Sequence, residues 1–286
     1  MESNPLDFTP YCKKCKLEYV EIVIADPAKN ITIFVLDRID SAPARAEAAR
    51  RLLADPSLKA EQVGFVVPPA DGRKTWRLEM MGGEFCGNAA RSFGLFVARE
   101  TGLKGCHTVM IEISGMQKSL PVHVDTEAGR AEVEIPRPLA QGSLNFEGQS
   151  FPVFVFDGIT HVIAPGLKPE PAAAERDAFF AIKALIEKGA RSHFDALGVM
   201  FYDTQNQFLR PAVYVAATDS LVFESSCGSG SAALACWKTA ALRDGEGRCD
   251  VAQSGGVIEV RVSKLGGEIS SITIGGPVSL SGRMKG

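Results

Sequence analysis

The chain has 286 residues, of which 45% are hydrophobic and 23% are charged, and its formal net charge is −3. This composition supplies enough apolar sequence for one large domain or two ordinary ones, and it argues against a basic surface for nucleic acid or for a membrane. No apolar run approaches the roughly 18 residues that suggest a membrane span, and the first residues do not form a secretory signal, so we expect a cytoplasmic protein.

The first half of the chain predicts a mixture of strands and helices. Residues 1–17 form an N-terminal extension with little periodicity, and the lone pair of Cys12 and Cys15 lacks the further ligands of a metal site. Apolar runs bounded by turn residues then predict strands, and Ala-rich stretches predict helices. The expected strands are 20–23, 31–36, 63–67, 77–81, 109–113, 119–124 and 131–135, and the expected helices are 44–54 and 87–100.

A second series of elements follows Pro136-Arg137-Pro138, which is a plausible domain boundary. The expected strands are 152–156, 160–163, 198–202, 212–216, 221–224, 257–262 and 270–274, and the expected helices are 173–188 and 228–243. Because strands outnumber helices and do not alternate with them, the predicted fold class is α+β.

Two cysteine-glycine corners form a weak internal repeat. Residues 84–90 read EFCGNAA and residues 224–233 read ESSCGSGSAA. Each corner follows a predicted strand and opens an Ala-rich helix, and the two cysteines, Cys86 and Cys227, lie about half a chain length apart. This spacing predicts two related domains that each present one such corner.

The position of these cysteines suggests acid–base chemistry. A cysteine at the start of a helix feels the positive end of the helix dipole and the unpaired N–H groups of the first turn. Both favour the thiolate, and such thiols can have pKa values of about 3.5–7.5. The same N–H groups can hold a carboxylate. Two facing corners could therefore hold an amino acid, remove its α-proton with one sulfur and return a proton with the other.

The alternative is that the cysteines are structural, since free cysteine is commonly buried as a small apolar residue. A single cysteine-glycine corner would favour that interpretation. Two matching corners, each after a strand with a glutamate upstream, favour the catalytic one. An odd total of seven cysteines without an export signal also indicates reduced thiols rather than a disulfide framework.

At these corners the sequence resembles the diaminopimelate epimerase family, whose racemases work without pyridoxal phosphate or any other cofactor and without a metal. The resemblance extends from about Val20 to Met284. It is closest to the histidine racemases of opine-type metallophore pathways. The strings that support it are EQVGF (61–65), GEFCGNA (83–89), LGVM (197–200) and ESSCGSG (224–230).

The resemblance implies two similar halves, each a curled, mostly antiparallel sheet around a central helix, with the active site in the cleft between them. The halves would be residues 18–138 together with 275–286, and residues 139–274. The implied partner is a small amino-acid substrate. A homodimer is expected only from the family, and neither nucleic acid nor a membrane is expected.

The resemblance also assigns roles to individual positions. Cys86 and Cys227 correspond to the catalytic cysteines. The substrate-binding positions would be Asn30, Gln62, His161 and Glu224, with the backbone of Gly87, Asn88, Gly228 and Ser229 holding the α-carboxylate. Glu224 would receive the α-ammonium group, although its spacing to Cys227 differs from the family pattern.

The departures from the family pattern concern the substrate side chain. The family's Asn-Pro-His motif reads Ile159-Thr160-His161, and no Glu-Arg pair precedes Cys227. The family's arginine clamps a distal carboxylate, so its absence argues against diaminopimelate and favours an uncharged side chain such as imidazole. Diaminopimelate epimerase, proline or hydroxyproline racemase and a non-catalytic amino-acid-binding paralogue remain as alternatives.

Overall fold

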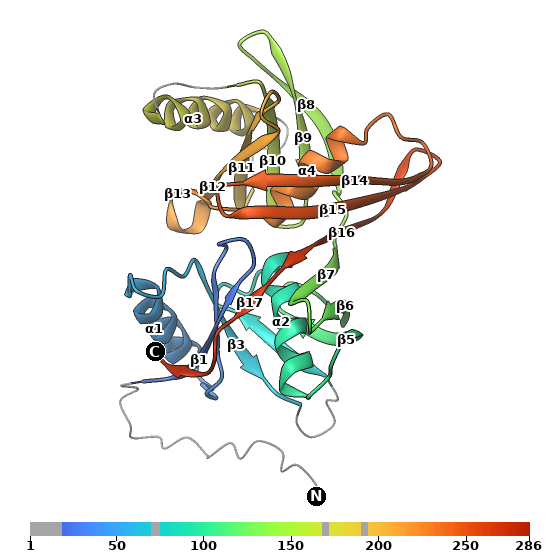
Figure 1. Cartoon of the computed structure of the whole chain (residues 1–286). Helices are drawn as coiled ribbons and strands as arrows, with labels where there is room; N and C mark the ends of the chain where they lie inside the picture. The colour runs from blue at the N-terminus through green and yellow to red at the C-terminus, as the bar shows by residue number, and fades with distance from the viewer. Residues whose placement is uncertain (1–18, 70–74, 168–171, 190–193) are drawn as a thin grey trace, which may run out of the picture. The chain divides into compact units, whose positions relative to one another are not determined.

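The computed structural model describes residues 19–69, 75–167, 172–189 and 194–286. Cys12, Cys15 and the N-terminal extension lie outside the described residues. The fold is a sheet-dominated mixture of strands and helices, as the sequence predicts (Figure 1). Its helices are α1 (Ala42–Ala54), α2 (Gly87–Glu100), α3 (Ala172–Lys188) and α4 (Gly228–Lys238), with a short 3-10 turn η1 (Ala216–Thr218).

The chain divides into two compact units, each described by itself. The N-terminal unit contains the described residues up to Pro27, Ile31–Gly129 and Val278–Gly286. The C-terminal unit contains Ala28–Asn30 and Arg130–Pro277. Cys86 belongs to the first unit and Cys227 to the second.

The N-terminal unit is built on a mixed sheet in which β1 pairs with β2, β2 with β3, and so on to β6. The β2–β3 and β4–β5 pairs are parallel, and the other pairs are antiparallel. The last strands of the chain return to pair with β1. The strands are β1 (Glu21–Asp26), β2 (Thr32–Val35), β3 (Gln62–Val67), β4 (Trp76–Met80), β5 (Cys106–Ile113), β6 (Leu120–Asp125), β17 (Ser279–Leu280) and β18 (Met284–Lys285).

Helix α2 is the buried centre of the N-terminal unit and packs against β5 and β6 (Figure 1). All but its terminal residues are buried, and Phe93 and Phe96 stack on each other and meet Phe34 of β2 edge to face. Such aromatic contacts add to the free energy gained from burying apolar area. The helix that carries Cys86 at its start is therefore held rigidly.

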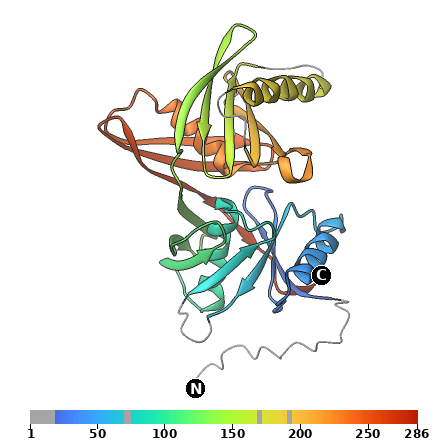
Figure 2. The same ribbon diagram turned by 180° about the vertical axis from the view of Figure 1, so that it is seen from behind.

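The C-terminal unit is mostly antiparallel. Its strand neighbours run β7–β16–β15–β14–β12–β11–β10–β9–β8, and β13 also pairs with β12. Helix α4 packs on β14, β15 and β16, and α3 packs on β8 and β11 (Figure 2). The strands are β7 (Arg130–Ile135), β8 (Ala140–Phe146), β9 (Gln149–Val155), β10 (Ile159–Pro165), β11 (Ala196–Asp203), β12 (Phe208–Val215), β13 (Ser220–Phe223), β14 (Gly245–Gln253), β15 (Gly256–Leu265) and β16 (Glu268–Pro277).

The prediction that the second central helix extends to residue 243 is wrong, because α4 ends at Lys238. Thr239 caps the helix, and its hydroxyl donates a hydrogen bond to the carbonyl of Ala235 at 2.8 Å. The following backbone bonds span three residues, as in turns, and lead the chain into β14. No helix among the described residues is long and apolar enough to cross a membrane.

Candidate active site

Cys86 is the N-cap residue of α2. Its backbone is extended, with φ −126° and ψ 114°, and its sulfur accepts a hydrogen bond from the backbone N–H of Ala89 at 3.4 Å. An N-cap side chain that accepts such a bond satisfies one of the unpaired donors of the first helical turn. The corner therefore presents a sulfur beside the exposed amides of a helix start, as the sequence predicts.

Two other predicted site residues lie beside Cys86. The side chain of Gln62, at the start of β3, forms a hydrogen bond with the sulfur. Asn88 is buried, and its side-chain oxygen accepts a hydrogen bond at 3.1 Å from Nε of Arg91, which is itself fully buried. The Asn88 side chain thus faces this arginine, and its backbone N–H donates a hydrogen bond to the Cys86 sulfur.

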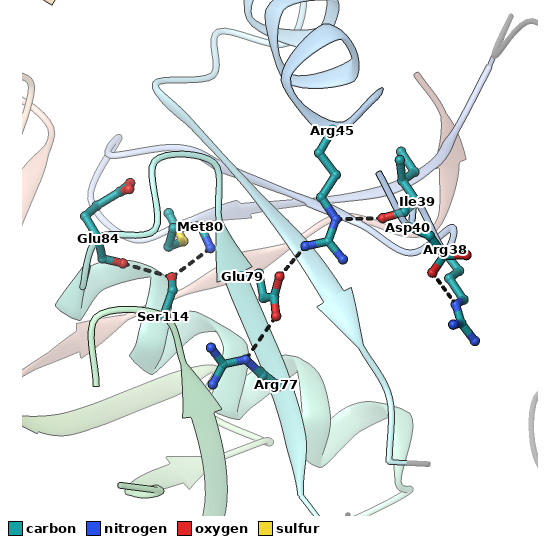
Figure 3. Close-up of polar contacts among 9 residues, drawn as sticks. All are labelled: Arg38, Ile39, Asp40, Arg45, Arg77, Glu79, Met80, Glu84 and Ser114. Carbon is teal, nitrogen blue, oxygen red and sulfur yellow. Dashed lines mark hydrogen bonds and ion pairs between the residues drawn. The ribbon is translucent and has the colours of Figure 1, made fainter. Parts of the chain in front are cut away.

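Ser114 holds the loop before Cys86 to the neighbouring strand. Its hydroxyl donates to the carbonyl of Glu84 and accepts from the N–H of Met80, both at 2.9 Å (Figure 3). Gly115 packs so closely on the backbone of Phe85 that a Cβ there would overlap the amide nitrogen. Further along β4, Glu79 joins Arg45 and Arg77 in an ion-pair network.

Cys227 is the N-cap residue of α4 and has nearly the same backbone conformation as Cys86, with φ −129° and ψ 117°. Its side chain is 7% exposed. The Ser229 hydroxyl lies 3.7 Å from the sulfur. Gly230 faces Met200 and Cys227 so closely that a Cβ there would overlap the Met200 sulfur. The glycine therefore allows α4 to begin against β11.

His161 lies on β10 and is completely buried. Its Nε2 forms a hydrogen bond with the Ser229 hydroxyl at 2.9 Å. The Ser229 hydroxyl thus contacts both His161 and the Cys227 sulfur. Its other ring nitrogen, Nδ1, is buried without a hydrogen-bond partner. Gly198 is the residue paired with His161 on β11, and a Cβ there would overlap Nδ1.

The thiol pKa values differ from the sequence expectation. Loss of hydration raises the pKa of Cys86 to about 11, although the Ala89 amide and the Gln62 side chain act in the opposite direction. Burial, followed by the Glu224 carboxylate, raises the pKa of Cys227 well above its ordinary value. The low pKa values expected from the helix starts are therefore wrong for this state, because desolvation outweighs the amide donors. Desolvation therefore favours the neutral thiol form of both sulfurs.

Burial lowers the pKa of His161 to about 3 from an ordinary value of 6.5. The folded protein thus keeps this ring neutral, while the unfolded chain binds a proton at His161 below about pH 6.5. Protonation therefore favours the unfolded state, and the free energy of unfolding decreases as the pH falls. Between pH 7.5 and 5.0 this group should lower the free energy of unfolding by about 2 kcal/mol. Urea unfolding at the two pH values measures this fall. It should be about 2 kcal/mol smaller in His161→Gln than in the unsubstituted protein.

The matched control is His107→Gln, because His107 is exposed at the surface of β5. We expect it to keep the pH dependence of the unsubstituted protein. Equal pH dependence in His161→Gln and His107→Gln would contradict a neutral, buried His161.

The structure groups most of the predicted site residues around one of the two cysteines. Gly87 and Asn88 open α2 after Cys86, and Gly228 and Ser229 open α4 after Cys227. Glu224 lies near Cys227, where its carboxylate raises the pKa of the thiol. Asn30 is buried in the short segment that groups with the C-terminal unit.

Several residues of these corners are not predicted by the sequence analysis. Ser114 and Arg91 support the Cys86 corner, and Gln253 and Ser231 lie against Cys227. A single serine or glutamine in a strand or helix gives no motif, so no sequence signal identifies them. Among the described residues, no group of three or more histidine, cysteine, aspartate or glutamate side chains could hold a metal ion.

Comparison with known proteins identifies the family. A family model described as "Histidine racemase CntK N-terminal domain" matches residues 17–285. The chain belongs to the histidine racemase family. The family includes a curated histidine racemase of Fusobacterium nucleatum, which is 31% identical over 225 residues, covering 77% of this chain and 80% of the relative. A histidine racemase of Staphylococcus aureus is 27% identical over 273 residues, covering 90% and 97%.

Solved structures show the same fold in other racemases and epimerases. A probable proline racemase from Agrobacterium radiobacter superposes with a TM-score of 0.61 at 14% identity, covering 92% of each chain. A hydroxyproline epimerase from Agrobacterium vitis gives a TM-score of 0.60 at 14% identity, covering 94% of this chain and 91% of that one. With its family membership, this places the chain among the isomerases, as an amino-acid racemase.

Proposed function

We propose that this racemase interconverts L- and D-histidine without a cofactor or a metal, using Cys86 and Cys227 as its two acid–base groups. The main supporting observation is that both cysteines are N-cap residues with nearly the same extended backbone, each at the start of a helix with a mostly buried interior. The names of the relatives support histidine as the substrate.

The proposed reaction balances with two protons. One sulfur first loses its proton to solvent. As thiolate, it then removes the α-proton and becomes a thiol again. The other sulfur, as thiol, delivers its proton to the opposite face of the α-carbon and becomes a thiolate. The enzyme therefore ends with its two protonation states exchanged, and the reverse reaction uses the same groups in exchanged roles. The chemistry requires the two sulfurs to address opposite faces of the substrate.

The high thiol pKa values suit this chemistry. An amino-acid α-proton is weakly acidic, so its removal needs a strong base. A thiolate whose conjugate acid has a pKa near 11 is a stronger base than an ordinary cysteine thiolate of pKa about 8.5. Burial also favours the protonated form of the other cysteine, which has to act as the acid. We propose that desolvation is the means by which both roles are obtained.

The remaining predicted residues are proposed to bind substrate. The backbone N–H groups of Gly87, Asn88, Gly228 and Ser229 would hold the α-carboxylate and the charge that develops on it. Glu224 would receive the α-ammonium group, since a carboxylate attracts a cation. Asn30, Gln62 and His161 would contact the rest of the substrate.

The proposed domain organisation follows the diaminopimelate epimerase resemblance, with two similar halves at 18–138 plus 275–286 and at 139–274. Each half would carry one cysteine corner. A homodimer is part of the same proposal, as is the absence of nucleic-acid and membrane partners.

Histidine is favoured over diaminopimelate by the segment before Cys227. Residues 217–221 read ATDSL and cover the turn after β12 and the first two residues of β13. The segment contains no arginine, so it offers no bidentate clamp for a second carboxylate. A neutral imidazole would not require one.

The proposed function predicts that the protein converts L-histidine to D-histidine and exchanges its α-proton with solvent. In D₂O, proton NMR should show loss of the α-proton signal, and chiral chromatography should show approach to an equal mixture of enantiomers. LL-diaminopimelate, L-proline and trans-4-hydroxy-L-proline serve as comparison substrates. Faster turnover of any of these would reject histidine as the substrate, and binding of histidine without deuterium incorporation would reject catalysis.

A further inference from the structure

A closed ring of hydrogen bonds surrounds the backbone of Cys227. Its N–H donates to Oε1 of Gln253 at 2.8 Å, and Nε2 of Gln253 donates to the Ser231 hydroxyl at 3.0 Å. The Ser231 hydroxyl in turn donates to the Cys227 carbonyl at 2.6 Å. One side chain from the end of β14 and one from α4 thus hold both polar groups of the Cys227 backbone.

The ring is dry. Gln253 is 4% exposed and Ser231 is 0% exposed, and each bond joins a buried donor to a buried acceptor. Loss of one partner in such a place leaves other polar groups without hydrogen bonds, which is costly in a low-dielectric interior. The three groups therefore constrain one another strongly.

The bonds act on the conformation of Cys227. Its φ and ψ determine where the Cα–Cβ bond points. The rotation about that bond, on which the final position of the sulfur also depends, is limited by the contact of the sulfur with the Ser229 hydroxyl. With the N–H held by Gln253 and the carbonyl held by Ser231, neither dihedral angle can change without breaking a buried bond. The Cys227 N–H is also directed at Gln253, the Gly230 N–H at the Cys227 sulfur and the Ser231 N–H at the Cys227 carbonyl. An anion at this helix start would therefore be bound by the amides of Gly228 and Ser229.

We propose that Gln253 is a positioning residue for Cys227, acting with Ser231 to aim the sulfur at the α-carbon. This inference rests on the proposed two-cysteine function. Proton transfer falls steeply when the reacting atoms are displaced by fractions of an ångström to an ångström. Removing the ring should therefore slow the chemical step more than it weakens substrate binding.

The test compares three variants of the full chain with L-histidine as substrate. Gln253→Leu removes both hydrogen bonds of the glutamine with little change of volume, and Ser231→Ala removes the hydroxyl. Thr239→Val is the matched control, because it deletes a hydroxyl that bonds to carbonyls at the other end of α4. Circular dichroism and thermal unfolding report whether each variant is folded at the assay temperature.

We expect kcat of Gln253→Leu to fall at least tenfold with KM changed by less than twofold, and kcat of Thr239→Val to stay within twofold. The α-deuterium isotope effect should also increase for the enantiomer whose proton Cys227 removes, because that step becomes more rate-limiting. A merely structural role would lower the melting temperature without changing the isotope effect. A folded Gln253→Leu protein with unchanged kcat would overturn the inference.

If Gln253→Leu does not fold, Ser231→Ala decides the question. It opens the ring but leaves the bond between Gln253 and the Cys227 N–H. We therefore expect kcat to fall at least threefold, and an unchanged kcat would overturn the inference.

Cys227→Ser separates this result from the proposed function. If Cys227→Ser is active, the two-cysteine function fails; if it is inactive while Gln253→Leu or Ser231→Ala is normal, only the positioning role fails.

Discussion

Replacing either Cys86 or Cys227 by serine should slow histidine racemisation by roughly 10³-fold or more. A hydroxyl is a far weaker acid than a thiol, so serine can neither form the base nor return the proton at a useful rate. The two losses should be similar, because the proposed mechanism uses both groups in every turnover. Chiral chromatography of timed samples measures the effect.

The control for this prediction is Cys236→Ser. Cys236 is buried on the same helix as Cys227, two turns further along, so it tests the general effect of placing serine in this core. Cys106→Ser is the exposed counterpart in the N-terminal unit. Both should retain activity, and an active Cys86→Ser or Cys227→Ser enzyme would exclude the two-base mechanism.

Replacing Gly198 by alanine should lower activity by about two orders of magnitude and cost about 1–3 kcal/mol of stability. The added methyl group would overlap Nδ1 of His161 and lie 2.8 Å from the Met200 methyl carbon. The imidazole cannot move freely, since its ring centroid lies 5.9 Å from that of Phe156 and Ser229 holds Nε2. The ring must therefore move and strain its bond to Ser229.

Gly142→Ala is the matched control for this substitution. Gly142 lies in strand β8 of the same unit, and a Cβ there would meet no atom within 4 Å. It should change activity and unfolding free energy little. If Gly198→Ala matched it in both steady-state kinetics and urea unfolding, the space beside His161 would have no functional importance.

The secondary structure could be predicted from the sequence where the elements are apolar or strongly helical. Helix α2 begins and ends at the predicted residues, because a cysteine-glycine corner precedes it and its apolar residues continue to its last turn. Strands β8 and β14 were not predicted. Both contain glycine and many polar residues, and their strand conformation comes from pairing with neighbours distant in sequence or across a turn.

The candidate site could be predicted in part. A motif at the start of a helix identifies Cys86 and Cys227, because the local sequence determines an N-cap. The raised thiol pKa values could not be predicted, since desolvation depends on the packing of the whole unit around each sulfur. For the same reason Gln253, which meets Cys227 only through the pairing of β14 with its neighbours, carries no signal in its own segment.

The desolvation of the two thiols also affects their reactivity toward oxidants, with Cys227 buried and Cys86 partly exposed. Peroxides and alkylating agents react with the ionised sulfur rather than with its protonated form. Surroundings that favour the thiol form of Cys86 and Cys227 should therefore slow their oxidation. The desolvation that makes each sulfur a strong base when it ionises also makes it a poor target while no substrate is bound.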